Sequence, residues 1–112
     1  MYADQEPTCA EVDALAGVTL LEFGAPWCPH CSGAQPALEA VLAGQTDVRH
    51  IKIKDGRGRR LGRSFRVKMW PTLVLLCDGK EIARRVRPTG RGEVEQAMAL
   101  LDRDALDPRA PD

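Results

Sequence analysis

Two cysteines separated by two residues have the clearest potential for chemistry in this sequence. They stand in the segment Trp27-Cys28-Pro29-His30-Cys31. A cysteine thiolate is the nucleophile of thiol–disulfide exchange, and a second cysteine one helical turn further on can attack the mixed disulfide and release the product. The spacing therefore predicts a redox-active pair that alternates between a dithiol and a disulfide.

The residues around this pair predict how the thiolate is stabilised. The motif follows an apolar run and begins a predicted helix from Cys28 to Gly44. A helix N-terminus presents free N–H groups and a positive potential, which favour the thiolate form of Cys28. Pro29 suits the first helical turn, because it lacks an N–H that would have no partner there. We therefore expect Cys28 to be the nucleophile and Cys31 to resolve the mixed disulfide.

A zinc half-site is the other chemistry open to such a pair. Structural zinc takes four ligands, and the further candidates are His30, His50, Cys9 and Cys77. A histidine between the two cysteines points away from a shared metal, so we predict no metal site. Cys9 and Cys77 are isolated in the sequence, and we expect both to be small apolar residues in the core or at its edge. No role is assigned to His50.

Four predicted strands and four predicted helices position these residues. Thr8 and Glu11 form a capping box that predicts a short helix ending at Gly17. The strands are predicted at 18–23, 48–53, 72–77 and 80–86, with an Asp78-Gly79 turn joining the last two. Later helices are predicted at 56–66 and over an apolar stripe of Val94, Ala97, Met98 and Leu101. The order predicts an α/β sandwich with a mixed sheet. We expect one domain at residues 1–104 and a loose tail at 105–112.

Charge is distributed unevenly along the 112 residues, although the formal net charge is zero. Residues 1–48 contain no Lys or Arg, whereas residues 49–91 hold most of the positive charge. Such asymmetry can orient a charged partner, or it can be a solvated face. The basic segment 57–68 has one aromatic residue and no nucleic-acid motif, so we expect no nucleic-acid partner.

The chain has no apolar run long enough to cross a membrane, and its first residues lack the features of a signal peptide. These two features predict a cytoplasmic protein.

Several separate motifs resemble the thioredoxin family over about residues 8–103. The segment from Ala25 to Cys31 matches the active site of that family, and Pro36 falls where the family kinks its active-site helix. Trp70-Pro71-Thr72 matches the segment whose proline is cis and packs opposite the redox pair. The resemblance implies a thioredoxin-like three-layer sandwich of about four strands, because few residues precede the first helix and the first strand is short or missing.

The resemblance also implies roles for residues outside the motif. Glu22 and Lys52 fall where the family places a buried carboxylate and its lysine partner. We expect Glu22 to relay a proton for Cys31, because burial raises the pKa of a carboxyl group towards neutrality; Lys52 is either its partner or simply exposed. Trp27 and Trp70 either form the apolar lip of a peptide groove with Pro71 or are ordinary packing residues.

The function implied is the reduction of protein disulfides by a monomer that needs no metal or organic cofactor. A thioredoxin-reductase-like, flavin-dependent electron donor would regenerate the dithiol. The Pro-His dipeptide, which differs from the usual Gly-Pro, is typical of DsbA-like oxidants, and His30 is expected to stabilise the Cys28 thiolate. A disulfide oxidase or isomerase is therefore an alternative, above all if an export signal has been removed. A further alternative is a binding module that docks a partner through residues 57–68.

Overall fold

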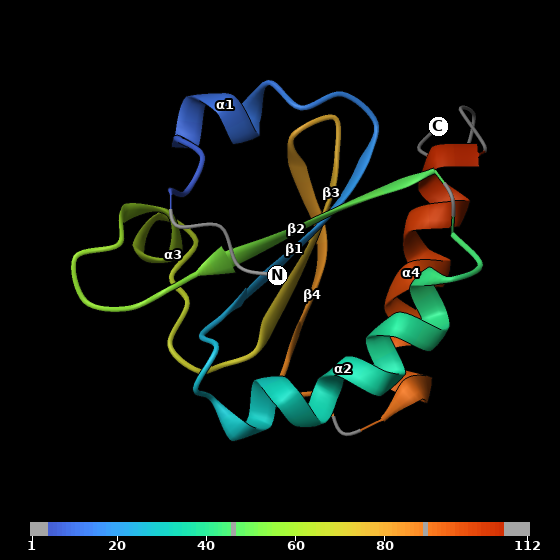
Figure 1. Ribbon diagram of the computed structural model, residues 1–112. Helices are drawn as coiled ribbons and strands as arrows, with labels where there is room; N and C mark the ends of the chain where they lie inside the picture. The colour runs from blue at the N-terminus through green and yellow to red at the C-terminus, as the bar shows by residue number, and fades with distance from the viewer. Residues whose placement is uncertain (1–4, 46, 89, 107–112) are drawn as a thin grey trace.

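A sheet of four strands forms the centre of the molecule (Figure 1). The structure is a computed structural model, and it describes residues 5–45, 47–88 and 90–106. Its strands are β1 (Val18–Gly24), β2 (Val48–Lys54), β3 (Thr72–Cys77) and β4 (Lys80–Val86), in the order β2-β1-β3-β4. β2 is parallel to β1, whereas β3 is antiparallel to both β1 and β4. The predicted mixed sheet is confirmed, and in the described chain no strand precedes β1.

Helices cover both faces of this sheet. α2 (Pro29–Leu42) and α4 (Arg91–Leu106) lie on one face, and the short helices α1 (Cys9–Asp13) and α3 (Arg60–Ser64) lie on the other (Figure 1). Pro36 lies inside α2, and the ribbon of this helix bends along its length. None of the helices in the described ranges is both long enough and apolar enough to cross a membrane. The predicted tail begins inside α4, and residues 107–112 lie outside the described residues.

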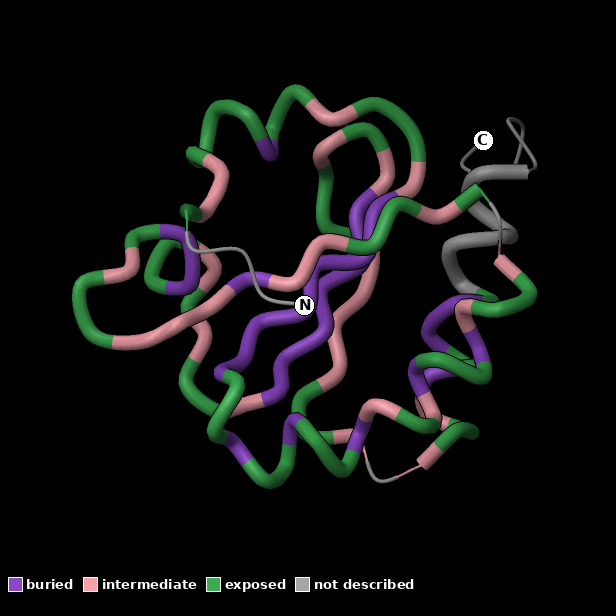
Figure 2. Tube along the Cα trace, viewed as in Figure 1, coloured by how far each residue is buried: buried purple, intermediate pink, exposed green. Residues whose placement is uncertain are grey.

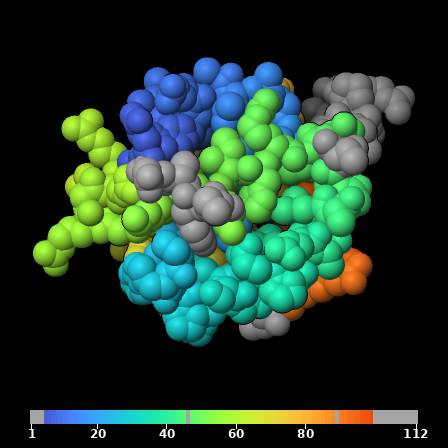
Figure 3. All heavy atoms as spheres, in the orientation of Figure 1, coloured from blue at the N-terminus to red at the C-terminus, as the bar shows by residue number. Residues whose placement is uncertain are grey.

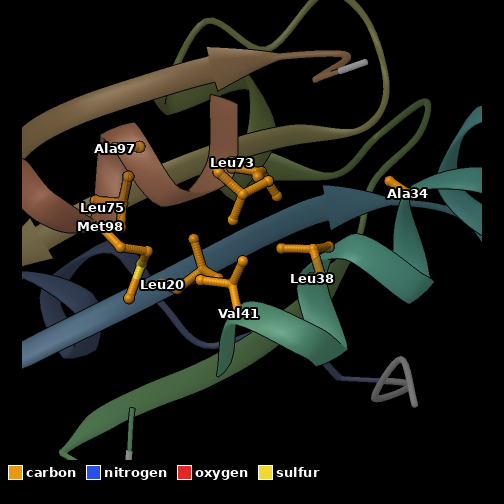
Figure 4. Packing of buried hydrophobic residues seen from close by; sticks show 9 residues of the cluster. Leu20, Ala34, Leu38, Val41, Leu73, Leu75, Ala97 and Met98 are labelled. Carbon is orange, nitrogen blue, oxygen red and sulfur yellow. The ribbon is translucent and has the colours of Figure 1, made fainter. Parts of the chain in front are cut away.

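The central strand explains why the sheet has two cores. β1 is buried from its second residue onward, as the tube coloured by burial shows (Figure 2). Because successive side chains of a strand point to opposite faces, Leu20 joins the cluster under α2 and α4, whereas Leu21 joins the cluster under α1 and α3. In the first cluster, Leu38 of α2 and Met98 of α4 pack near Leu20 (Figure 4). Glu22 follows Leu20 by two positions on β1, so its side chain is directed to the same face of the sheet, the one that α2 covers.

The Arg-rich segment forms much less helix than the sequence predicts. Only the five residues of α3 are helical, while Gly56 and Gly58 before them adopt φ values of 151° and 81°. Leu61 is the apolar anchor of this segment, since it is buried against the sheet. The side chains around α3 project from one edge of the molecule (yellow-green in Figure 3).

The β3–β4 hairpin turn also fixes the loop that leads into β1. Asp78 and Gly79 have φ values of 52° and 81°, as the turns that favour Asp-Gly require. A Cβ atom at position 79 would collide with the main-chain carbonyl of Asp13. The Asp78 carboxylate accepts a hydrogen bond from the Gly17 N–H at 2.7 Å, which ties the turn to the start of β1.

Candidate active site

The cysteine pair lies where β1 passes into α2. Cys28 is the N-cap residue of α2, with extended backbone angles, and Pro29 occupies the first helical turn. The Sγ of Cys28 accepts a hydrogen bond from the Cys31 N–H at 3.2 Å. Both cysteines are buried, with exposed fractions of 4% at Cys28 and 2% at Cys31. A sulfur that accepts a main-chain N–H at a helix N-terminus is stabilised as an anion.

Two tryptophans form one side of this site. Trp70 packs against Ala25, Cys28 and Cys31, and its Nε1–H donates a hydrogen bond to the Asp55 carboxylate at 2.9 Å. Trp27 meets Trp70 edge to face, with ring centroids 5.2 Å apart, yet 71% of its surface is exposed. A large aromatic side chain that stays exposed beside a buried thiol is suited to contact a partner. The structure therefore brings together the two tryptophans that the sequence singled out.

A groove of about 410 Å³ lies next to the cysteines. It is lined by residues of α2 and of the segments that flank β3 and β4, namely Pro29, His30, Gly33, Ala34, Pro71, Arg87 and Pro88. The peptide bond between Trp70 and Pro71 is cis, as predicted. His30 is exposed in the first turn of α2 and forms part of the groove wall.

A second group of polar residues lies on the sheet beneath α2. Glu22 is fully buried on β1 and faces Lys52 across the parallel pair of strands. The Gln35 amide donates hydrogen bonds to the Glu22 carboxylate at 2.6 Å and to the carbonyl oxygen of Cys31 at 3.1 Å. Lys52 donates to the side-chain oxygen of Gln35 at 3.1 Å. His50 lies 2.8 Å from the other carboxylate oxygen of Glu22. The network thus links the buried carboxylate to the main chain at Cys31.

The direction of the Glu22 pKa differs from the prediction. Burial does raise the pKa of this carboxyl group, and it is the largest single influence. Hydrogen bonds from His50 and Gln35, together with the positive charges of Lys52 and His50, act in the opposite sense and outweigh it. The pKa of Glu22 therefore lies below its ordinary value. The expectation of a carboxyl group raised towards neutrality is wrong, because it considered burial without the donors.

His50 and Gln35 are the site residues that sequence reasoning missed. His50 precedes Lys52 by two positions on β2, so both side chains are directed to the face that carries Glu22. The alternation along β2 was therefore a usable signal for His50. Gln35 follows Cys31 by four positions, the spacing that places two residues on one face of a helix. Its contact with Glu22 depends on how α2 packs on the sheet, which the sequence pattern does not specify.

The two isolated cysteines occupy different environments. Cys77 is partly buried against the core under α2 and α4, as predicted. Cys9 is exposed, and its predicted place in the core or at its edge is wrong, because α1 has only five residues and buries Val12 alone. Over the described ranges, no cluster of three or more His, Cys, Asp or Glu side chains could hold a metal ion.

Comparison with known proteins agrees with this geometry. The sequence profile of the family described as Thioredoxin matches residues 5–100. The chain is 37% identical over 95 residues to a thioredoxin of Chlamydia trachomatis, an alignment that covers 84% of this chain and 81% of the relative. It is also 37% identical over 76 residues to a thioredoxin domain-containing protein of Theileria parva, of which it spans 34%, while 65% of this chain is covered.

A solved structure shows the same fold with higher identity. The reduced form of thioredoxin 2 from Pseudomonas aeruginosa superposes with a TM-score of 0.82 and 50% identity, over 91% of this chain and 95% of that one. The family match covers most of the chain, and the cysteine pair stands at the N-terminus of the helix that follows the central strand. The chain therefore belongs to the thioredoxin family, and it is a thiol–disulfide oxidoreductase with the redox pair Cys28 and Cys31.

Proposed function

We propose that this oxidoreductase works in the reducing direction on disulfides of protein substrates. The observation that supports this most directly is the Cys28 sulfur, which accepts the Cys31 N–H at a helix N-terminus beside an exposed aromatic surface and a groove. Such an arrangement favours a thiolate nucleophile and provides a surface on which a polypeptide can lie. Family membership implies protein disulfide substrates in general terms.

The reaction consists of two exchanges. The Cys28 thiolate attacks one sulfur of the substrate disulfide, and the other substrate sulfur leaves as a thiolate that takes up a proton. The Cys31 thiolate then attacks the Cys28 sulfur and breaks the mixed disulfide, so the second substrate sulfur leaves and is protonated. Two electrons pass from the protein dithiol to the substrate, and the protein retains a disulfide between Cys28 and Cys31. The two cysteines hold the electrons, and the proposal needs no metal or organic cofactor.

Glu22 is proposed to accept the proton that Cys31 must lose before its attack. The carboxylate is fully buried, and Gln35 bonds both Glu22 and the main chain of Cys31. Because the pKa of Glu22 lies below its ordinary value, the group is ionised near neutral pH and therefore has no proton of its own. The lowered pKa also makes the carboxylate a weak base, so it holds the proton only briefly. Lys52 acts as the relay partner through its hydrogen bond to Gln35 and its charge.

His30 is proposed to stabilise the Cys28 thiolate, with Pro29 shaping the first turn between them. The anion exists only in the reduced form, so any group that stabilises it favours the dithiol and makes the disulfide a stronger oxidant. A Pro-His pair should therefore give a potential less reducing than the roughly −270 mV of thioredoxin. The same histidine is the observation that favours the second candidate, a disulfide oxidase or isomerase.

A protein that reduces disulfides needs an electron donor that returns it to the dithiol form, and it needs a reducing compartment. We propose that a thioredoxin-reductase-like flavoprotein returns the protein to its dithiol, so that the protein takes part in electron transport and redox homeostasis of the cytoplasm as a monomer. The exposed residues of the basic segment 57–68, namely Arg57, Arg60, Arg63, Arg66 and Lys68, would orient an acidic partner during encounter.

A glutathione redox titration of the wild type and of His30→Ala tests the proposal. We expect a wild-type potential between roughly −270 and −180 mV, and a more reducing potential for His30→Ala. A wild-type potential near the roughly −120 mV of DsbA would support the oxidase instead. A potential that His30→Ala leaves unchanged, or makes more oxidising, would contradict the role of His30.

A further inference from the structure

Arg87 is held in an unusual position at the wall of the groove beside the redox pair. Its φ is 48°, in the left-handed region that a residue with a Cβ atom adopts at an energetic cost. Its main-chain N–H donates to the Pro71 carbonyl at 2.8 Å, and its Nε–H donates to the Trp70 carbonyl at 2.9 Å. Side chain and main chain together therefore fix this arginine to the segment that packs against the cysteines.

The guanidinium keeps binding capacity after these contacts. Nε–H is occupied by the Trp70 carbonyl. Within the described ranges no acceptor is bonded to Nη1 or Nη2, whose donors can hold a carboxylate. Arg87 is exposed, and no salt bridge joins it to a carboxylate of the described chain. The other described residues of the groove are apolar or small, apart from His30, and none of them is acidic. The groove therefore offers a positive charge that no carboxylate of the described residues neutralises.

The groove also lies beside the nucleophile, where a substrate bonded to Cys28 would be held. Pro29 and His30 follow the nucleophile Cys28 directly, and Pro71 follows the tryptophan that packs on both cysteines. A substrate disulfide bonded to Cys28 therefore has neighbouring residues of its chain in or near the groove. Its volume of about 410 Å³ is sufficient for a short side chain and part of a backbone.

We propose that Arg87 is a specificity residue that selects disulfides with an acidic side chain next to the reacting cysteine. This inference rests on the proposed reduction of protein disulfides, and it specifies the class of substrate. Arg87 binds the carboxylate of an aspartate or glutamate of the substrate, and this contact places the substrate sulfur beside Cys28. The chemical step is the same two-exchange reduction, since the carboxylate takes no part in bond making or breaking.

The test uses three disulfide peptides that differ only beside one cysteine, where they contain glutamate, glutamine or lysine. The reduced protein is mixed with each peptide in a single turnover at low salt, and the second-order rate constant is measured by acid quenching and thiol alkylation. We expect the wild type to reduce the glutamate peptide roughly three- to tenfold faster than the glutamine peptide, the range for a partly exposed charge-assisted contact. Added salt should reduce this ratio.

Arg87→Gln should abolish the preference for glutamate, and Arg87→Glu should favour the lysine peptide. Lys80→Gln is the matched control, because it removes one exposed positive charge at the start of β4, the opposite end of that strand from Arg87, and should keep the wild-type ratio. The glutamine peptide normalises any general loss of activity. The proposal is overturned if the wild type shows no preference, if Arg87→Gln keeps it, or if Lys80→Gln loses it equally. A wild type that reduces none of the peptides would instead contradict the proposed function.

Discussion

The Nε2 atom of His50 lies 2.8 Å from the Oε1 atom of Glu22, so a partly exposed imidazole on β2 reaches a carboxylate that is fully buried on β1. An ionised carboxylate is costly to bury without donors. His50 supplies one donor and Gln35 supplies another, which explains how an acidic residue is tolerated inside the central strand.

Removal of the imidazole should therefore change the titration of the carboxyl group. In His50→Ala the burial of Glu22 stays while a hydrogen bond and a nearby charge are lost, so we expect the pKa of Glu22 to rise. The measurement is a carbon NMR titration of the Glu22 carboxyl resonance. Arg49→Gln serves as the control, since Arg49 neighbours His50 on β2 but bonds Thr19 and the Ala16 carbonyl. A Glu22 pKa that is unchanged or lower in His50→Ala would show that His50 does not stabilise the ionised carboxylate.

The same pKa direction predicts how stability depends on pH. The pKa of Glu22 is lowered in the folded state, so the folded protein binds fewer protons than the unfolded chain at this group. The stabilisation from ionised Glu22 is complete above the ordinary glutamate pKa and is lost as the pH falls through the lower, folded value. The free energy of unfolding of the wild type relative to Glu22→Gln should thus fall on acidification, by up to about 1.4 kcal/mol per pH unit between the two pKa values.

Denaturant unfolding of the two proteins across that range gives this difference directly. Glu22→Gln keeps the size of the side chain and removes its titration. A difference that grows as the solution is acidified would mean that the folded pKa is raised, contrary to the hydrogen bonds seen at Glu22.

The two cysteines should differ in their reactivity towards iodoacetamide. Cys28 is the N-cap residue of α2 and its sulfur accepts an N–H, whereas Cys31 lies within the helix. We expect alkylation of Cys28 to be much faster than that of Cys31, Cys9 or Cys77 near neutral pH. Mass spectrometry of peptides from the quenched protein separates the four sites. Equal rates at Cys28 and Cys31 would remove the basis for assigning the nucleophile, and faster alkylation of the more exposed Cys9 would show that access outweighs the helix terminus.

Local patterns predicted the elements of the fold well. The strands 72–77 and 80–86 have the predicted bounds. The apolar run marks the first strand, and the Asp-Gly turn sets where that strand ends and where the second one begins. The capping box at Thr8 and Glu11 is present, with both hydrogen bonds formed. The segment 56–66 was predicted less well, since glycines at positive φ shorten the helix. The spacing of Leu61 and Phe65 fits a helix but does not specify its length.

The part of the site that is formed by residues close together in the sequence could be predicted. The Cys-x-x-Cys spacing and Pro29 place both cysteines and the start of α2 without knowledge of tertiary contacts. The partners of Glu22 depend on the register of β1 with β2 and on the packing of α2 above them, and neither is a local property. For the same reason the direction of the Glu22 pKa could not be predicted from burial.

Reduction of insulin by dithiothreitol, compared among the wild type, Cys28→Ser and Cys31→Ser, tests most directly whether Cys28 starts the reduction of protein disulfides. The wild type should accelerate precipitation of the insulin B chain, and Cys28→Ser should reduce the rate to that of dithiothreitol alone. Cys31→Ser should accumulate a mixed disulfide between Cys28 and insulin, visible by mass spectrometry without added reductant. Catalysis that persists in Cys28→Ser, or a wild type no faster than dithiothreitol alone, would contradict the assignment.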